Sequence, residues 1–463
     1  MMAMGFSVLN KRAVVLGAGR SGLAAARLLV SRGARVTLAD TRTHLDRCAD
    51  LERAGIAVEL GPHRAALLSE ADLVVLSPGV PPAQDVVEAA RRAGVEVIGE
   101  IELASRWLKG RVIAITGTKG KSTTTTLIAR MLEAGDLLVT AGGNLGTALS
   151  EQVATTRSDV VHVVEVSSFQ LETADTFHPW ISVLVNLSPD HLDRHASFEE
   201  YAAAKARIFA QQTASDWAVV NADDSGAMAL AEGTAARRFD FGFDRLVGDG
   251  VTVDGDQVVV RRNGTTSVVV PLASVRVPGR HLLADVMAAA AVATIAGVSP
   301  AAIQRAVEGF TGLEHALEAV GERHGVRYVN DSKATNVVSA RRAIESFDRD
   351  VVVIMGGRYK GGEFRDLRDV MASRVRAVIA IGEATERITT ALGDLVPVEP
   401  ALSMGDAVRQ ATAHAVTGGV VLLAPACSSF DMFEDYAARG RAFKDEVARL
   451  GVDAGDRQRA SMA

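Results

Sequence analysis

The tripeptide Gly120-Lys121-Ser122 lies between an apolar, strand-like run and a helix-like one. This order is typical of a nucleotide phosphate loop, in which backbone amides surround the phosphate oxygens. Lys121 would place its charge on the β- and γ-phosphates, and Ser122 would offer a hydroxyl to Mg²⁺. A strict G-x-x-x-x-G-K-[ST] motif would need glycine where the chain has Ile115, so we interpret the loop as a shortened variant and not as a plain turn.

A second glycine-rich loop, Gly17-Ala18-Gly19-Arg20-Ser21-Gly22, follows another strand-like run, and Asp40 ends the next one. The spacing matches the dinucleotide-binding fingerprint, in which small residues let the backbone approach a pyrophosphate at a helix N-terminus. By itself the motif fits a nicotinamide or flavin site, or a tight turn with no ligand. Two phosphate loops imply two nucleotide-like ligands, since a dehydrogenase has no use for the second loop and a simple ATPase none for the first.

Two further groups lie close to the ends of predicted strands. Glu165 ends the run 160–166, and His191 comes shortly after the run 181–187. Ligands of parallel sheets bind at the carboxyl ends of the strands, so both side chains could hold magnesium together with Ser122. Taken alone, the segment around His191 is more typical of a solvated charged loop. Lys205 lies in an alanine-rich helix, and for a lone lysine a surface cation is the simpler interpretation.

Alternating strand-like and helix-like runs position these residues. The first hundred residues, the segment from Val112 and the segment from about Val326 each show a βαβ rhythm, which favours a parallel sheet in each third. From Val251 to Val277 the hydrophobic period changes to two, with Asp-Gly and Asn-Gly turn signals, which predicts a small antiparallel part. We expect an α/β fold of three domains: residues 1–99, 100–312 and 313–463.

Composition and charge exclude several classes of protein. The chain has 463 residues, of which 48% are hydrophobic and 23% charged, as in a folded globular protein. The net charge of −6 provides no large positive field for nucleic acid, and two cysteines cannot form a disulfide framework. The N-terminus lacks a signal-peptide pattern, and residues 282–298 are too weakly apolar to span a membrane. We expect a cytoplasmic protein that binds neither nucleic acid nor membrane.

The residues together resemble the Mur ligase family, ATP-dependent amide-bond synthetases of peptidoglycan precursor assembly, with folylpolyglutamate synthetase as a more distant relative. The resemblance spans nearly the whole chain. Besides the two glycine loops, the segments that carry it are Asp40-Thr41-Arg42, Ser77-Pro78-Gly79, Gly142-Gly143-Asn144, Glu165 to Glu172, Asn330 to Asn336 and Pro425 to Phe433. Chance agreement across so many segments is implausible.

The resemblance implies a Rossmann-like N-terminal domain for a UDP-sugar, a central P-loop ATPase-like domain for ATP, and a C-terminal Rossmann-like domain for an amino acid. NAD is then not expected. The residues implied around UDP-N-acetylmuramoyl-L-alanine are Gly17, Gly19, Arg20, Ser21, Asp40, Thr41, Arg42, Ser77, Gly79 and Asn144. Those implied around ATP are Gly117, Thr118, Lys119, Gly120, Lys121, Ser122, Thr123, Asp285, Asp331 and Lys333.

The implied reaction adds D-glutamate to this UDP-sugar through an acyl phosphate. In the family the helix lysine that matches Lys205 is carbamoylated, which turns a cation into a metal-binding anion. The implied ligands of Mg²⁺, as two ions and with Mn²⁺ as an alternative metal, are Ser122, Glu165, His191 and carbamoyl-Lys205. The implied catalytic residues are Lys121, His191, Lys205 and Lys360, and the implied D-glutamate contacts are Thr335, Lys360, Ser429 and Phe433. A monomer that takes only small-molecule substrates is expected.

The chain differs from the family's usual pattern at four positions. Lys119 stands where asparagine is common, Leu282 and Asp285 stand where two asparagines are usual, and Ala316 stands where arginine often follows His315. These differences leave the phosphate and metal groups in place. The alternatives are another Mur ligase or a folylpolyglutamate synthetase-like enzyme with a different amino acid, a NAD-linked oxidoreductase, and a nucleotide-binding regulator without turnover.

Overall fold

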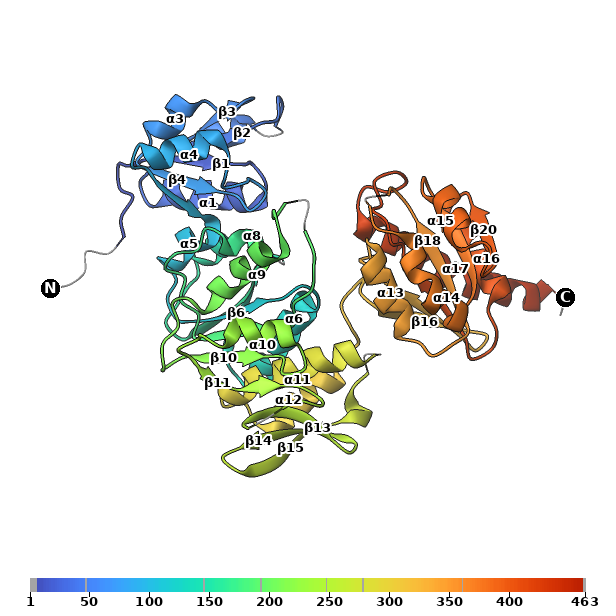
Figure 1. Cartoon of the computed structure of the whole chain (residues 1–463). Helices are drawn as coiled ribbons and strands as arrows, with labels where there is room; N and C mark the ends of the chain where they lie inside the picture. The colour runs from blue at the N-terminus through green and yellow to red at the C-terminus, as the bar shows by residue number, and fades with distance from the viewer. Residues whose placement is uncertain are drawn as a thin grey trace. The chain divides into compact units, whose positions relative to one another are not determined.

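The computed structural model describes residues 6–45, 48–144, 146–191, 194–246, 248–276, 279–359 and 361–460, with residues 451–460 described by their backbone alone. The chain divides into two compact units, Met1–Val275 with Ala284–Val307, and Arg276–Leu283 with Glu308–Ala463. The predicted α/β fold is confirmed, because three mostly parallel sheets and one small sheet are accompanied by helices (Figure 1). The domain boundaries expected near residues 99 and 312 stay predictions.

The N-terminal sheet has five parallel strands in the order β3-β2-β1-β4-β5. The strands are β1 (Arg12–Leu16), β2 (Arg35–Asp40), β3 (Ile56–Leu60), β4 (Leu73–Leu76) and β5 (Glu96–Gly99). The helices are α1 (Arg20–Ser31), α2 (Cys48–Arg53), α3 (Ala65–Ser69), α4 (Asp85–Arg92) and α5 (Glu100–Ser105). The central strands β1 and β4 are apolar and buried on both faces, as expected for a covered parallel sheet.

The central sheet has six parallel strands in the order β11-β10-β9-β6-β8-β7. The strands are β6 (Arg111–Thr116), β7 (Leu138–Gly143), β8 (Val160–Glu165), β9 (Ile181–Leu184), β10 (Trp217–Val220) and β11 (Arg237–Arg238). The helices are α6 (Lys121–Ala134), α7 (Leu149–Gln152), α8 (Ser168–Leu171), α9 (Phe198–Ala206) and α10 (Ser225–Ala231), with a 3-10 turn at Arg207–Phe209. Because β6 lies between β8 and β9, the loops after these three strands are neighbours at one sheet edge.

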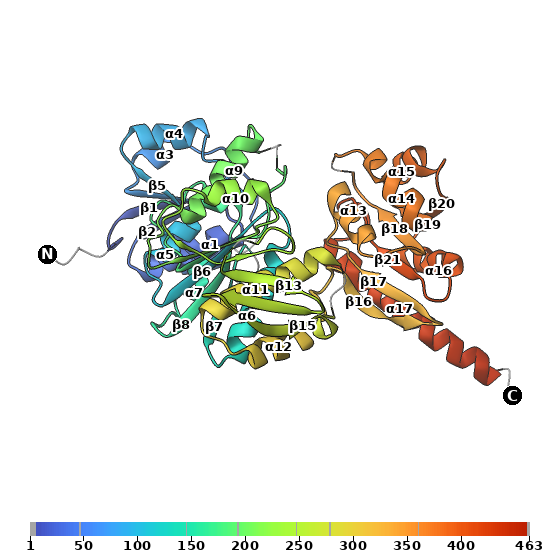
Figure 2. The ribbon, with the colours of Figure 1, turned by 60° about the horizontal axis from the view of Figure 1, so that its bottom comes forward.

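The predicted antiparallel part is the small sheet β12-β13-β14-β15. Its strands are β12 (Asp240–Phe241), β13 (Gly250–Asp254), β14 (Gln257–Arg262) and β15 (Thr265–Pro271), and only β12 pairs in parallel. A 3-10 turn (Leu272–Ser274), α11 (Arg280–Ile295) and α12 (Pro300–Glu308) follow it in sequence. In two views, α12 lies beside this sheet (Figures 1 and 2). Among the described residues, no helix is long and apolar enough to cross a membrane.

The second unit contains a six-stranded sheet in the order β16-β17-β21-β18-β19-β20, in which only the edge strand β16 is antiparallel. The strands are β16 (Glu318–Arg323), β17 (Val326–Asn330), β18 (Val351–Gly356), β19 (Val375–Ile381), β20 (Val398–Ala401) and β21 (Val420–Leu423). The helices are α13 (Val337–Glu345), α14 (Arg368–Arg374), α15 (Thr385–Leu392), α16 (Met404–His414) and α17 (Tyr436–Ala460), with a 3-10 turn at Phe364–Leu367. Strands β17, β21 and β18 are neighbours, so the loops at their carboxyl ends form one edge.

A buried carboxylate, Glu102 on α5, joins the N-terminal and central sheets of the first unit. Its side chain is 0% exposed and accepts the backbone amides of Asp175, Thr176 and Phe177 at 2.9–3.0 Å. The Thr176 hydroxyl and Arg106 Nε complete its partners. Helix α5 follows β5 of the N-terminal sheet, and residues 175–177 precede β9 of the central sheet. The Glu102 carboxylate therefore connects the two sheets.

We expect Glu102→Ala to lower the free energy of unfolding by about 3–5 kcal/mol, because the change leaves Arg106 and three amides without their buried acceptor. The measurement is urea unfolding of the full chain followed by circular dichroism. Glu96→Gln is the matched control, because Glu96 pairs with the same Arg106 at a half-exposed position and should cost less than about 1 kcal/mol. Equal losses in the two variants would contradict the role given to Glu102.

Candidate active site

The phosphate loop joins β6 to α6. Gly120 caps the helix with a φ of 83°, a conformation that favours glycine. A Cβ atom at Gly120 would also lie 2.3 Å from Oδ1 of Asp285, a residue far away in sequence. The amides of Thr118 and Lys119 both donate to Oδ1 of Asn186, at 3.1 and 2.9 Å, which fixes the path of the loop.

Two lysines meet at one carbonyl oxygen of this loop. Lys121 Nζ donates to Gly117 O at 3.0 Å and to Thr118 O at 2.9 Å, and Lys205 Nζ donates to the same Gly117 O at 2.8 Å. Lys205 is buried on α9, and its Nζ lies 4.6 Å from the centre of the Tyr201 ring. Burial lowers the pKa of Lys205 well below its usual value, and the charge of Lys121 lowers it further, against the opposite effect of Asp190 and Glu165. Lys205 is therefore not the surface cation that a lone lysine suggests.

Glu165 and Asn144 lie together at the ends of β8 and β7. Asn144 Nδ2 donates to Glu165 Oε1 at 2.8 Å, and the Asn144 amide donates to the Glu165 carbonyl at 2.9 Å. The other carboxylate oxygen, Glu165 Oε2, is buried and has no hydrogen-bond partner among the described residues. Arg20 Nη2 donates to Asn144 O at 3.3 Å, so the first glycine loop also contributes a residue here. A buried oxygen without a donor is a candidate ligand for a cation.

His191 contacts the aromatic ring of Phe169, with ring centroids 5.0 Å apart. Phe169 also stacks on His195, which lies buried between Ser168 Oγ at 3.0 Å and Glu172 Oε1 at 3.2 Å. His195 thus anchors the segment that carries His191 to α8. The sequence patterns gave His195 no role, and only its spacing of four residues from His191 could have indicated one.

The remaining predicted residues of the central loop have identifiable partners. Lys119 Nζ pairs with Asp190 Oδ2 at 3.2 Å. Ser122 is half-buried and Thr123 buried in the first turn of α6. Asp285 Oδ1 accepts the hydroxyl of Thr124 at 3.2 Å. Behind the loop, Tyr201 Oη lies 3.0 Å from Thr118 Oγ1, a contact that sequence reasoning missed because the two residues are far apart in the chain.

The first glycine loop is held by Asp40 and Ser77. Asp40 Oδ2 accepts the Ala18 amide at 2.6 Å, and its carboxylate forms a two-bond pair with Arg42 at 2.8 and 3.0 Å. These hydrogen bonds with Arg42 and Ala18 hold the pKa of Asp40 well below its usual range, although burial acts the other way. Ser77 Oγ donates to Gly17 O at 2.8 Å.

Four further residues predicted for the UDP-sugar belong to the same sheet edge. Gly19 caps α1, and Ser21 lies in the first turn of that helix. Thr41 directly follows β2 and is exposed, and Gly79 lies in the turn after β4. A Cβ atom added at Gly19 or at Gly79 would have no other atom within 4 Å, so space for a ligand exists beside the backbone.

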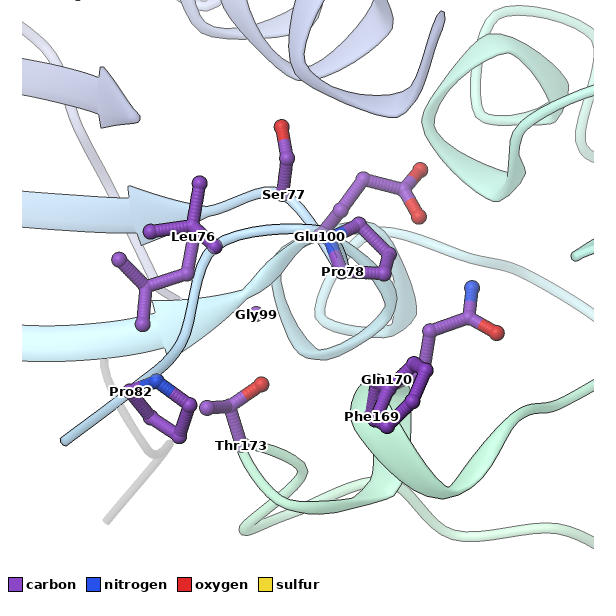
Figure 3. A pocket seen from close by; sticks show the side chains of 10 residues that line it. Leu76, Ser77, Pro78, Pro82, Gly99, Glu100, Phe169, Gln170 and Thr173 are labelled. Carbon is purple, nitrogen blue, oxygen red and sulfur yellow. The ribbon is translucent and has the colours of Figure 1, made fainter. Parts of the chain in front are cut away.

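A small cavity of about 10 Å³ lies next to Ser77, between β4, α5 and α8, and is large enough for roughly one water molecule (Figure 3). Figure 3 shows Glu100 and Gln170 among its lining side chains. Glu100 Oε2 and Gln170 Nε2 are buried and have no hydrogen-bond partner among the described residues. Burial raises the pKa of Glu100, whose Oε1 accepts the Ser150 amide at 2.6 Å. Nothing in the sequence pattern distinguished Glu100.

The second unit carries Thr335, Ser429 and Phe433, which are predicted for the amino acid, and Lys333, which is predicted for ATP. Lys333 and Thr335 follow β17, and the Lys333 amide donates to His315 O at 3.0 Å. Ser429 is buried after β21. The Phe433 amide, which we expected on the D-glutamate carboxylate, donates to Ser429 O at 2.8 Å, and its ring packs against the core of this unit. Lys360 lies outside the described residues.

Asp331, predicted at the ATP site, is buried at the end of β17. Its Oδ1 accepts the Leu317 amide at 3.3 Å. Burial raises the pKa of Asp331 to about 7, against the opposing effects of the Leu317 amide and Lys333.

No group of three or more His, Cys, Asp and Glu side chains gathers in the described part of the chain as a metal site would need. The predicted set contains only two such residues, Glu165 and His191, beside a hydroxyl and a modified lysine. Its assignment therefore stays a prediction that depends on the modification of Lys205.

The fold and the site define an α/β nucleotide-binding protein with a phosphate loop in its central sheet. Family models for the Mur ligase MurD-like N-terminal domain, the Mur ligase middle domain and the Mur ligase glutamate ligase domain match residues 11–99, 115–293 and 317–427. The chain belongs to the Mur ligase family.

Relatives at high identity share one name, UDP-N-acetylmuramoylalanine–D-glutamate ligase. The protein of that name from Acidobacterium capsulatum is 46% identical, over 95% of this chain and 96% of its own. The one from Geobacter metallireducens is 44% identical, over 96% and 98%. Among solved structures, UDP-N-acetylmuramate-alanine ligase MurC from Thermotoga maritima has a TM-score of 0.60 at 20% identity, over 96% of this chain and 99% of its own, which supports the shared fold.

We expect the contribution of Asp331 to the free energy of unfolding to fall as pH rises from about 4 to about 7, because Asp331 ionises in the unfolded chain at its usual pKa but stays protonated in the fold up to about pH 7. Asp331→Asn should abolish this contribution, which amounts to at most about 4 kcal/mol. Urea unfolding of both proteins at about pH 4 and pH 8 measures the difference. Asp366→Asn, at an exposed position of the same unit, is the control; parallel pH curves for wild type and Asp331→Asn would contradict the prediction.

Proposed function

We propose that this chain is an ATP-dependent ligase that adds D-glutamate to UDP-N-acetylmuramoyl-L-alanine in peptidoglycan precursor synthesis. The observation that carries the proposal is the match to ligases of that name at 40–46% identity over nearly the whole chain. The gathering of Lys121, Lys205, Glu165 and Asn144 around one sheet edge supports it, because these groups suit the activation of a carboxylate by a triphosphate.

The chemistry has two steps. A carboxylate oxygen of the UDP-sugar substrate attacks the γ-phosphorus of ATP, and ADP leaves with the electrons of the broken P–O bond. The amine of D-glutamate then attacks the acyl carbon, and the tetrahedral intermediate expels phosphate as the amine loses a proton. Lys121 reduces the repulsion between the carboxylate and the phosphates, which is the main barrier to the first step. Family membership favours this ligase chemistry over the nicotinamide-linked alternative.

The residues at the sheet edge fit Mg²⁺. Glu165 Oε2 is a buried carboxylate oxygen that lacks a donor among the described residues, and oxygen atoms are the ligands that Mg²⁺ prefers. Ser122, Glu165, His191 and a carbamate on Lys205 would hold the metal, which would neutralise phosphate charge. The buried amine of Lys205, with its lowered pKa, is suited to react with CO₂, because only a neutral amine attacks it.

The same proposal assigns the substrates to the chain. Residues 1–99 would bind the UDP-sugar, 100–312 ATP, and 313–463 D-glutamate. Gly17 to Ser21, Asp40 to Arg42, Ser77, Gly79 and Asn144 would contact the first substrate. Thr335, Lys360 and Ser429 would contact D-glutamate, with Phe433 supporting Ser429 through its amide. The protein would act as a cytoplasmic monomer.

Phosphate release across a panel of amino acids tests the proposed reaction. We expect ATP consumption only when UDP-N-acetylmuramoyl-L-alanine and D-glutamate are both present. Turnover with L-glutamate, L-alanine, lysine or diaminopimelate in place of D-glutamate would assign the chain a different Mur ligase activity. Hydride transfer to nicotinamide, or no turnover at all, would refute the proposal.

Carbamoylation of Lys205 has its own test. In bicarbonate, native mass spectrometry and peptide mapping should locate the added mass of one CO₂ at Lys205. Lys205→Ala should lower kcat by about a hundredfold or more, with partial recovery on addition of a small carboxylate. Lys109→Ala, at an exposed lysine of the same unit, should retain activity. An unmodified Lys205, or an unimpaired alanine variant, would rule the carbamate out.

A further inference from the structure

Arg439, on the first turn of α17, is the largest fully buried side chain of the described residues, with 0% exposure. Among the described residues, no carboxylate oxygen lies within ion-pair distance of its guanidinium. Its partners are neutral: Ser332 Oγ at 3.0 Å, Ser332 O at 2.8 Å, Cys427 O at 3.1 Å and Gly356 O at 3.5 Å. Burial lowers the pKa of Arg439 to about 10, so the group remains charged at neutral pH.

These partners belong to three different loops. Ser332 follows β17, Gly356 ends β18, and Cys427 follows β21, and these three strands are neighbours in the sheet. Arg439 therefore joins three loops at the carboxyl edge, where open α/β sheets bind their ligands. The fit is close, since a Cβ at Gly357 would lie 3.2 Å from Arg439 Nη1. Lysine could not reproduce this arrangement, because its three donors lie on one nitrogen atom, whereas Nε, Nη1 and Nη2 of Arg439 each reach a different acceptor.

Two of the loops carry residues assigned above to the amino acid. Thr335 comes three residues after Ser332, and Ser429 two residues after Cys427. The charge of Asp431, in the loop after β21, raises the pKa of Arg439 against the effect of burial, so the charge of the guanidinium is partly balanced. The side chain itself is enclosed, so it acts through the loops.

We propose that Arg439 is a positioning residue of the amino-acid site: by bonding to three strand-end loops, it holds Thr335 and Ser429 in place for the amino acid. The inference rests on the proposed function, in which this edge binds D-glutamate. The proposal predicts that substitution of Arg439 raises the KM for D-glutamate and leaves the KM values for ATP and the UDP-sugar nearly unchanged. A residue that only stabilised the fold would instead affect the KM of all three alike, or of none.

The test compares steady-state kinetics of the full chain and three variants. Arg439→Met should raise the KM for D-glutamate about tenfold or more, while the KM values for ATP and the UDP-sugar change less than about twofold. Arg439→Lys keeps the charge and loses the planar guanidinium. Its KM for D-glutamate should lie between the values of Arg439→Met and wild type. Arg449→Met is the matched control, because Arg449 lies on the same helix and forms an exposed ion pair with Glu446. Its KM values for all three substrates should equal those of wild type.

Thermal unfolding shows which variants fold. If Arg439→Met does not fold, Ser332→Ala replaces it, because this change removes one acceptor of Arg439 and one hydrogen bond to Tyr436 O but keeps the other contacts of the guanidinium. A rise of about threefold in the KM for D-glutamate is then expected. An unchanged KM for D-glutamate in the folded variants, or an equal rise for all three substrates, would overturn the proposal. If wild type uses a different amino acid, the proposed function is wrong, and the same comparison with that amino acid decides the role of Arg439.

Discussion

Two lysine amines share one carbonyl oxygen, that of Gly117, and the chemistry of the central sheet edge depends on this crowding. Two positive charges on a common acceptor repel each other, and burial of one of them strengthens the repulsion because water no longer screens it. Burial and the charge of Lys121 both lower the pKa of Lys205, so Lys205 holds its proton less tightly than an exposed lysine does. A lysine with a lowered pKa beside Glu165 and a phosphate loop is better suited to react as an amine than an exposed lysine is.

Lys205 and Arg439 show two ways of burying a cation. The ammonium of Lys205 is a compact charge with few acceptors around it, so burial lowers its pKa well below the usual value. The guanidinium of Arg439 spreads its charge over a planar group that bonds to Ser332, Cys427 and Gly356, and it stays protonated. The first arrangement suits a residue that is modified, and the second suits one that holds loops in place.

Much of the fold could be predicted because strand-like runs and glycine loops are local patterns. The sequence also predicted that the loops carrying Lys121 and Glu165 lie at one sheet edge, because parallel sheets bind their ligands at the carboxyl ends of the strands. The edge strand β16 was missed, because Glu318–Arg323 is half-exposed and polar and lacks an apolar pattern. His195, Tyr201, Glu100 and Arg439 were missed for another reason: their partners come from distant segments, and a single sequence does not show which segments meet. The final helix begins at Tyr436, and before it the amides of Met432 and Phe433 donate to Ser429 O in a separate turn.

Asp40 shows why the dinucleotide fingerprint could not identify a ligand. In that fingerprint the acidic residue at the end of the second strand binds a ribose hydroxyl, which requires a carboxylate oxygen free to accept. Here Arg42 and the Ala18 amide occupy both carboxylate oxygens of Asp40. The Asp40 carboxylate therefore holds the glycine loop in place, and the half-exposed Arg42 neutralises its charge. The backbone geometry of the loop serves any pyrophosphate, so only the partner of the acidic residue distinguishes one nucleotide class from another.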